Sequence, residues 1–210
     1  MKVIVVGNGA SVLKNKQGKF IDDHDIVIRL GGYKIEGYEN FVGSKTDIWS
    51  NGVSTIKIWK YFNEDVVNKH LWVMIPEDGF TNNEYLKKWQ NVKYEERQFS
   101  QFTHNEKMEK LKLNNMVECI SNRHLEILLE ELMVAKYHVD SNVLRPTLGI
   151  CTIFAALRKY NHVNIVGFDF FKTGWYWNAD HIYTIGKHEP LMEKIWLAKL
   201  KKGNIIKTYD

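Results

Sequence analysis

The sequence predicts an α/β fold built on one doubly wound, mainly parallel sheet. Short β-branched runs without polar breaks, such as Lys2–Val6, alternate with helical segments, which is typical of buried parallel strands. A glycine turn, Gly7–Ser11, follows the first run at once. The 210 residues are 44% hydrophobic, enough for a full core, and contain no repeat or low-complexity linker. We therefore expect a single Rossmann-like domain over residues 1–210.

The individual elements follow from the spacing of apolar and turn residues. Strands are expected at Lys2–Val6, Asp25–Leu30, Thr46–Ser50, Leu71–Ile75, Val117–Ile120, Val163–Gly167 and Asn204–Lys207. Helices are expected between them at Asn82–Gln90, Glu106–Leu113, His124–Met133, Gly149–Lys159 and Pro190–Leu200. In such a sheet, ligands are expected beyond the carboxyl ends of the strands.

The glycine turn is a candidate ligand-binding segment. Gly7 and Gly9 can take positive φ and let the backbone approach a ligand, while Asn8 and Ser11 offer side-chain hydrogen bonds to phosphate or ribose. The turn matches only part of the dinucleotide fingerprint because its third glycine is missing, so the glycines could also do no more than turn the chain. Arg29 ends the second strand where an acidic residue would bind NAD, which argues against NAD but leaves NADP open.

Composition excludes several classes of protein. No run reaches the ~20 apolar residues that cross a bilayer, and the first apolar run is too short for a signal peptide. Cys119 and Cys151 lack zinc or CxxC spacing, as expected for buried thiols in a reducing compartment. The net charge of +4 is mild and its lysines are spread evenly, so we expect no nucleic-acid partner. The basic stretch Lys199–Lys202 suits a solvated helix end or a peripheral contact with an anionic membrane.

One histidine near the end of the chain is a candidate general base. His188 follows His181 by seven positions and precedes Glu193 by five. Histidine titrates near neutrality, so it can take a proton from a sugar hydroxyl as that oxygen attacks. A surface or helix-capping role is the alternative.

Four blocks of residues, in order, resemble the sialylmotifs of glycosyltransferase family 29. The large motif is similar to Val5–Ser11, Ile21–Arg29 and Val42–Asp47, the small motif to Arg145–Gly149 and Val163–Asp169, the third to His181 with Tyr183, and the very small motif to His188 with Glu193. The stretch from Gly167 to His188 also resembles the bacterial family 42 sialyltransferases.

The resemblance implies an inverting, metal-independent transferase of the GT-A variant fold that moves a sugar, most simply sialic acid, from a CMP-linked donor to a glycan or glycolipid hydroxyl. The resemblance also implies that the enzyme uses no cofactor. His188 would be the base, His181 would assist the departing phosphate with Tyr183, and Glu193 would brace the structure. Asn51 would lie beside the cytidine. The donor-binding set implied is Gly7, Asn8, Gly9, Ser11, Arg29, Asn51, Arg145, Thr147, Gly149, Asp169 and Tyr183.

Two departures from the family pattern leave alternatives open. Gly31 stands where an asparagine is usual, and Leu148 stands where a hydroxyl residue helps to hold the donor carboxylate. The donor could therefore be CMP-Kdo or another nucleotide sugar. The chain could also be a non-catalytic nucleotide-binding module or, more remotely, a Rossmann oxidoreductase. Arg29 and Arg145 could be structural, paired to Asp47 or Asp169.

Two further expectations concern the setting of the protein and one aromatic loop. No cysteine lies near residue 3, so the disulfide of vertebrate members cannot form. This agrees with a cytoplasmic protein of bacterial or viral origin. Peripheral contact with the inner face of a membrane is compatible with that setting. Gly174–Asn178 is aromatic enough to stack on a sugar or a nucleobase, or to pack its rings into the core. The oligomeric state is left open.

Overall fold

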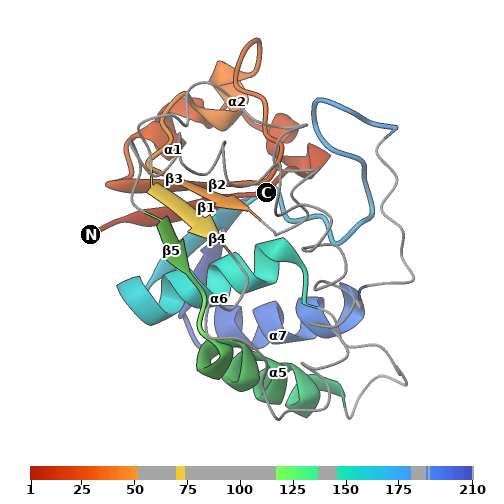
Figure 1. Cartoon of the computed structure of the whole chain (residues 1–210). Helices are drawn as coiled ribbons and strands as arrows, with labels where there is room; N and C mark the ends of the chain where they lie inside the picture. Colours follow the sequence, from red (N-terminus) through yellow and green to blue (C-terminus); the bar gives the residue numbers. More distant parts are fainter. Residues whose placement is uncertain (52–69, 74–116, 137–145, 181–187, 189, 210) are drawn as a thin grey trace, which may run out of the picture.

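The computed structural model describes residues 1–51, 70–73, 117–136, 146–180, 188 and 190–209 (Figure 1). Its seven-stranded sheet has the order β5-β4-β3-β2-β1-β6-β7, and each of these neighbouring strand pairs is parallel. The strands are β1 Val3–Val6, β2 Ile26–Leu30, β3 Ile48–Asn51, β4 His70–Val73, β5 Val117–Cys119, β6 Val163–Val166 and β7 Ile206–Thr208. The doubly wound parallel sheet is confirmed. The single domain over residues 1–210 stays a prediction.

Helices cover both faces of the sheet (Figure 1). The short α1 and α2 lie on one face, and α5, α6 and α7 lie on the other. The helical segments are η1 Ala10–Lys14, α1 Gly18–Asp22, α2 Glu39–Val42, α5 Asn122–Lys136, α6 Leu148–Tyr160 and α7 Pro190–Lys202. The helices expected at 82–90 and 106–113 lie outside the described residues. The sequence did not predict η1, α1 or α2, because segments of four or five residues are too short to show a helical period.

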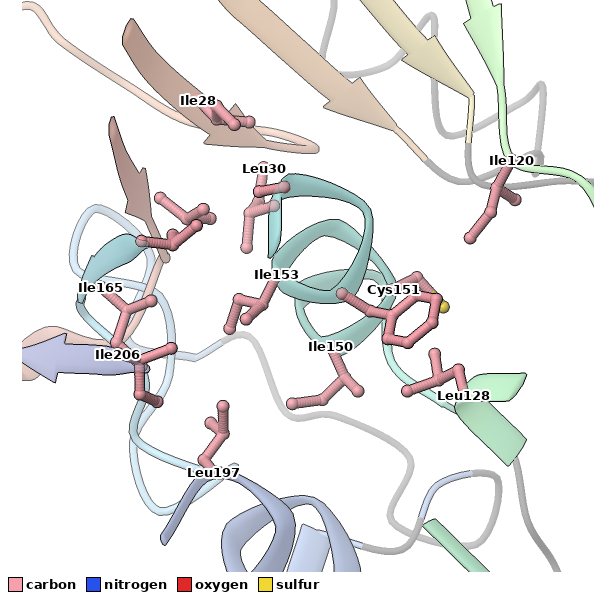
Figure 2. Packing of buried hydrophobic residues seen from close by; sticks show 14 of the residues in the cluster. Ile28, Leu30, Ile120, Leu128, Ile150, Cys151, Ile153, Ile165, Leu197 and Ile206 are labelled. Carbon is pink, nitrogen blue, oxygen red and sulfur yellow. The ribbon is translucent and has the colours of Figure 1, made fainter. Parts of the chain in front are cut away.

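Alternation along β1 divides the core between the two faces. Val3 and Val5 belong to the larger cluster, which includes residues of α5, α6 and α7, whereas Ile4 and Val6 belong to a smaller cluster on the other face. Figure 2 shows Ile150 and other side chains of α6 packed within the larger cluster. The unbroken apolar run in β1 thus reflects burial on both faces.

The last strand begins later than the sequence predicted. It was expected at Asn204–Lys207, but Asn204 has a φ of 55° and its amide donates to Lys201 O at 3.0 Å, so this residue belongs to the turn that ends α7. Strand β7 therefore begins at Ile206.

The order of the strands places a topological switch point at β1. This strand pairs with β2 on one side and with β6 on the other, although β6 comes much later in the chain. At such a point the connections leave the sheet in opposite directions, and the carboxyl ends of the two strands border a crevice where ligands bind. The turns after β1 and β6 meet at this point.

Candidate active site at the carboxyl edge of the sheet

The turns after β1 and β6 approach each other more closely than side chains would allow. A Cβ atom on Gly7 would lie 2.3 Å from Gly167 O, and the Gly9 amide donates to the same carbonyl at 2.9 Å. The positive φ expected for both glycines is wrong, because Gly7 is not among the glycines with positive φ and Gly9 has a φ of −67°. Glycine is required there because a Cβ would lie 2.5 Å from Asp169 Cγ. The glycines accommodate contact between two parts of the chain.

A carboxylate of the chain itself occupies the amide at the start of η1. Asp169 Oδ2 accepts a hydrogen bond from the Ser11 amide at 2.9 Å and another from Thr173 Oγ1. In a dinucleotide-binding protein, amides at this position bind the pyrophosphate. A phosphate placed here would face a fixed negative charge, which weighs against the oxidoreductase alternative. Ser11 and Asp169, expected to bind the donor, bind each other in this structure.

Two asparagines at this edge each have a buried amide atom with no hydrogen-bond partner among the described residues. Asn8 Nδ2 donates to Leu30 O at 3.0 Å and Gly32 O at 3.1 Å, which leaves its Oδ1 as the atom without a partner. Asn51, at the end of β3, is 5% exposed, and its buried Nδ2 has no hydrogen-bond partner among the described residues. Such atoms are rare in folded proteins, so they mark positions where a ligand could supply the missing group.

The N-terminus of α6 supplies donors at the same edge. The Thr147 hydroxyl accepts from the Ile150 amide at 3.3 Å and so caps the helix. The amides of Leu148 and Gly149 have no acceptor among the residues that the structure describes. The helix dipole and these two amides favour a negatively charged ligand.

Helix α7 holds this N-terminus through Glu193. Its carboxylate accepts from the Thr147 amide at 2.6 Å and from the Thr147 hydroxyl at 2.9 Å. The side chain of Glu193 is buried, with the residue 5% exposed. The bracing role expected for Glu193 agrees with these bonds.

The two departures from the family pattern lie side by side. Leu148, half-buried, packs against the larger core cluster, and its Cδ2 lies 3.6 Å from the position of a Cβ on Gly31. Gly31 has a φ of +49°, which glycine adopts without strain. An apolar side chain therefore lies at the first turn of α6, where the family pattern has a hydroxyl group.

Arg29 is positioned as a structural residue. It is fully buried, and its guanidinium donates to Val42 O at 2.8 Å, Lys45 O at 3.0 Å and Thr46 Oγ1 at 3.0 Å. These bonds fix the segment between α2 and β3. Of the two roles that the sequence left open for Arg29, the structure favours the structural one over donor binding, with oxygens of this segment as acceptors.

His188 lies beside the segment that follows β6. The half-buried imidazole stacks on the Phe171 ring, with centroids 5.9 Å apart and planes 18° apart. The remaining predicted site residues, His181, Tyr183 and Arg145, lie outside the described residues. Phe171 was not singled out from the sequence, because no local pattern connects it with a histidine so far along the chain.

The aromatic loop packs against the protein itself. Trp175 and Tyr176 are buried, the Tyr176 hydroxyl donates to Lys34 O and accepts from the Lys34 amide, and Trp177 Nε1 donates to Gly32 O at 3.2 Å. Burial raises the pKa of Tyr176 to about 12. The structure thus favours the packing interpretation over sugar stacking.

Within the described ranges, no three His, Cys, Asp or Glu residues gather as a metal site would require, and metal independence stays a prediction. None of the helices in those ranges has the length and apolar character needed to cross a membrane.

The fold is similar to that of known sialyltransferases. Two solved structures share the fold: a mammalian sialyltransferase with a TM-score of 0.60 and 17% identity, covering 99% of this chain and 68% of that one, and a sialyltransferase in complex with CMP with a TM-score of 0.56 and 16% identity, covering 100% and 80%. These likenesses establish the sialyltransferase type of α/β fold that the sequence predicted.

Curated relatives match over shorter segments. The mouse alpha-N-acetylgalactosaminide alpha-2,6-sialyltransferase 2 is 44% identical over 57 residues, 27% of this chain and 15% of that protein. A beta-1,6-galactosyltransferase of Arabidopsis thaliana is 52% identical over 44 residues, 21% of this chain and 11% of that protein. The matched segments thus span under a sixth of these relatives. The model of glycosyltransferase family 29 (sialyltransferase), in contrast, matches residues 2–205, and the chain therefore belongs to this family.

Proposed function

We propose that this chain transfers a sugar, most simply sialic acid, from a CMP-activated donor to a glycan or glycolipid hydroxyl, with inversion and without a metal ion. The family match over residues 2–205 and the CMP bound to a protein of the same fold support this proposal. A further neighbour is a mammalian sialyltransferase in complex with a Gal-beta-1-3GalNAc derivative, which supports a glycan as acceptor.

The observation that carries the proposal is a set of polar groups at the carboxyl edge that have no partner among the described residues. Asn8 Oδ1 can accept from a ribose or base donor, and Asn51 Nδ2 can donate to an acceptor on the nucleotide. The Leu148 and Gly149 amides, at the positive end of α6, can donate to the donor's phosphate. This combination of donors with an acceptor is compatible with a nucleotide that carries one phosphate.

In the proposed reaction, His188 takes the proton of the acceptor hydroxyl as that oxygen forms a bond to the anomeric carbon. The bond between that carbon and the phosphate oxygen breaks, and CMP leaves with the electron pair. The α6 amides stabilise the charge that develops on the phosphate, with His181 and Tyr183 as further proposed donors. Because attack and departure take place on opposite faces of the sugar, the configuration inverts.

A different donor sugar is the second candidate. Leu148 presents an apolar side chain at the first turn of α6. One relative of this chain, from Arabidopsis thaliana, is a beta-1,6-galactosyltransferase. A carboxylate that faced leucine would lose a hydrogen bond worth on the order of 1.5 to 3 kcal/mol. If CMP-sialic acid is the donor, Leu148→Ser is expected to tighten its binding. No gain, combined with transfer from a UDP-hexose, whose sugar has no carboxylate, would favour this second candidate, whereas CMP-Kdo carries the same carboxylate and would face the same leucine.

Two experiments test the proposed function. In a thermal-shift series with CMP, CDP, UDP, GDP and NADP, we expect CMP to stabilise the protein in the presence of EDTA. In a transfer assay, we expect His188→Ala to lower kcat by roughly 10²- to 10⁴-fold with CMP affinity nearly unchanged. Stabilisation by NADP or UDP but not by CMP would contradict the assignment of a CMP-activated donor. Stabilisation by CMP without transfer across a broad panel of donors and acceptors would indicate a binding module.

A cytoplasmic setting is also proposed, with peripheral membrane contact through the basic end of α7. Lys199, Lys201 and Lys202 lie in the last turn of α7, and Lys201 Nζ donates to Thr208 Oγ1 at 2.7 Å. Binding to vesicles with and without anionic lipid tests the membrane contact.

A further inference from the structure

The turn after β6 carries two phenylalanines with left-handed backbone. The Lys172 amide donates to Asp169 O at 3.1 Å, and Phe170 and Phe171 between them have φ values of 51° and 61°. Positive φ at both central positions is the mark of a type I′ turn, in which asparagine and glycine are preferred. Bulky side chains are strained in this region, and such strain persists where the surrounding structure enforces it.

The structure fixes this turn from both ends. Asp169 Oδ2 accepts from the Ser11 amide at 2.9 Å and from Thr173 Oγ1, and Thr173 Oγ1 accepts from the Ala10 amide at 3.1 Å. The residues that flank the two phenylalanines are therefore bound to the first turn of η1. The strained conformation is enforced by the same contacts that join the turns after β1 and β6.

The two rings have different surroundings. Phe170 packs against the larger core cluster, which accounts for its side chain. Phe171 belongs to neither core cluster of the described residues, and its ring stacks on the imidazole of His188. Among the described residues, the stack on His188 is therefore a contact that the Phe171 ring makes outside both core clusters.

We propose that Phe171 is a positioning residue for His188. The inference rests on the proposed function, in which His188 is the base. The nitrogens of an imidazole form hydrogen bonds in the plane of the ring, so a stacked ring orients the imidazole without competing for those hydrogen bonds. The turn holds the phenyl ring in place, and the stack holds the imidazole in one orientation. An aromatic face also stabilises the imidazolium that forms after proton transfer.

Two substitutions separate the ring from the fold. Phe171→Asn removes the ring but tolerates the left-handed backbone, and Phe171→Tyr keeps the ring. For Phe171→Asn we expect a melting temperature equal to or above that of the wild type, a fall in kcat of roughly 10- to 100-fold, and a KM for the donor that changes by less than about twofold. Phe171→Tyr should keep kcat within about threefold of the wild type. A lower melting temperature with unchanged kcat in Phe171→Asn would show that the ring is structural.

A double-mutant cycle tests whether Phe171 acts through His188. In the His188→Ala background, Phe171→Asn is expected to cause no further loss of kcat, whereas a full additional loss would overturn the proposal. NMR supplies a readout that needs no turnover. The side-chain proton resonances of His188, assigned by their absence in His188→Ala, should carry a ring-current shift in the wild type and in Phe171→Tyr, and lose it in Phe171→Asn.

The outcomes distinguish the two proposals. If His188→Ala transfers at the wild-type rate, the base assignment of the proposed function is wrong and the positioning role is wrong with it. If His188→Ala is impaired but Phe171→Asn retains the wild-type kcat, only the positioning role is wrong.

Discussion

The carboxylate of Glu193 accepts hydrogen bonds from both the amide and the hydroxyl of Thr147, at 2.6 and 2.9 Å. Thr147 in turn caps α6, whose first amides have no acceptor among the described residues. Glu193 follows the proposed base His188 by five residues. One short segment of the chain thus carries the proposed base and also fixes the helix end that would bind the donor's phosphate.

Replacement of Thr147 should affect both stability and nucleotide binding. Thr147→Val removes the cap of α6 and one donor to the buried Glu193, so we expect a loss of roughly 0.5 to 2 kcal/mol in the free energy of unfolding and weaker binding of CMP. Thr147→Ser keeps the hydroxyl and serves as the control. Urea unfolding and calorimetric titration measure the two effects. Equal behaviour of the two variants would show that the hydroxyl contributes to neither.

Replacement of Asn51 by leucine should weaken CMP binding without destabilising the ligand-free protein. Its buried Nδ2 has no partner among the described residues, so Asn51→Leu removes a group whose burial is unfavourable and should leave the stability of the ligand-free protein unchanged or higher. The same change should weaken CMP binding by roughly 3- to 10-fold, because the ligand loses one hydrogen bond. Loss of stability together with unchanged affinity for CMP would remove Asn51 from the proposed site.

Cys151 should be inert in the folded protein. Burial, and then the nearby charge of Glu193, raises the pKa of this thiol well above its usual range, so the reactive thiolate is absent at pH 8. In a Cys119→Ser background, a disulfide reagent should react with Cys151 only after the protein is unfolded in guanidinium. Rapid reaction of the native protein would contradict the buried position of this side chain.

Asp22 should contribute stability that disappears in acid. Burial alone would raise its pKa, but hydrogen bonds from the Lys45 and Ser44 amides and the Ser44 hydroxyl, together with the charge of Arg29, lower the pKa below its ordinary value. Because the folded protein binds this proton less readily than the unfolded chain, the contribution is complete above the ordinary pKa of 3.8 and is lost as pH falls through the lower folded value.

Comparison of two variants isolates this contribution. Asp22→Asn should be less stable than the wild type at pH 7, and the difference should shrink below about pH 4. Asp23→Asn is the matched control, because among the described residues the Asp23 carboxylate forms a surface ion pair with the exposed Lys19, and its replacement should have little effect at either pH. A difference for Asp22→Asn that stays constant with pH would contradict this assignment.

The sequence predicted the parts of the fold that local patterns determine. The strand before Gly7 could be predicted because a strand buried on both faces has a continuous apolar run, and α6 could be predicted from the helical spacing of its apolar residues. The bond between Asp169 and Ser11 joins residues 158 positions apart, and the bond between Glu193 and Thr147 joins residues 46 apart. No local pattern predicts such pairings. For Arg29, the sequence could not choose between an anion-binding and a structural arginine, since the choice depends on burial.

The left-handed backbone at Phe171 was equally beyond sequence reasoning, because phenylalanine gives no signal for positive φ. The glycine turn was identified as important, but for a different reason. Its glycines were expected to approach a ligand, and they approach Gly167 and Asp169. The predicted position of the turn in the fold was right, the contacts with Gly167 and Asp169 were not foreseen, and ligand binding by this turn stays a prediction.

The central place of β1 in the sheet has a consequence for the order in which the protein folds. During synthesis, β1 can pair with β2 soon after both leave the ribosome, but its other edge has no partner until β6 is made, as the pairing of Val5 with Ile165 shows. An unpaired apolar edge is a site of aggregation. The nascent chain therefore carries this exposed edge from the synthesis of β1 until that of β6, and slower elongation between these strands should increase its dependence on chaperones.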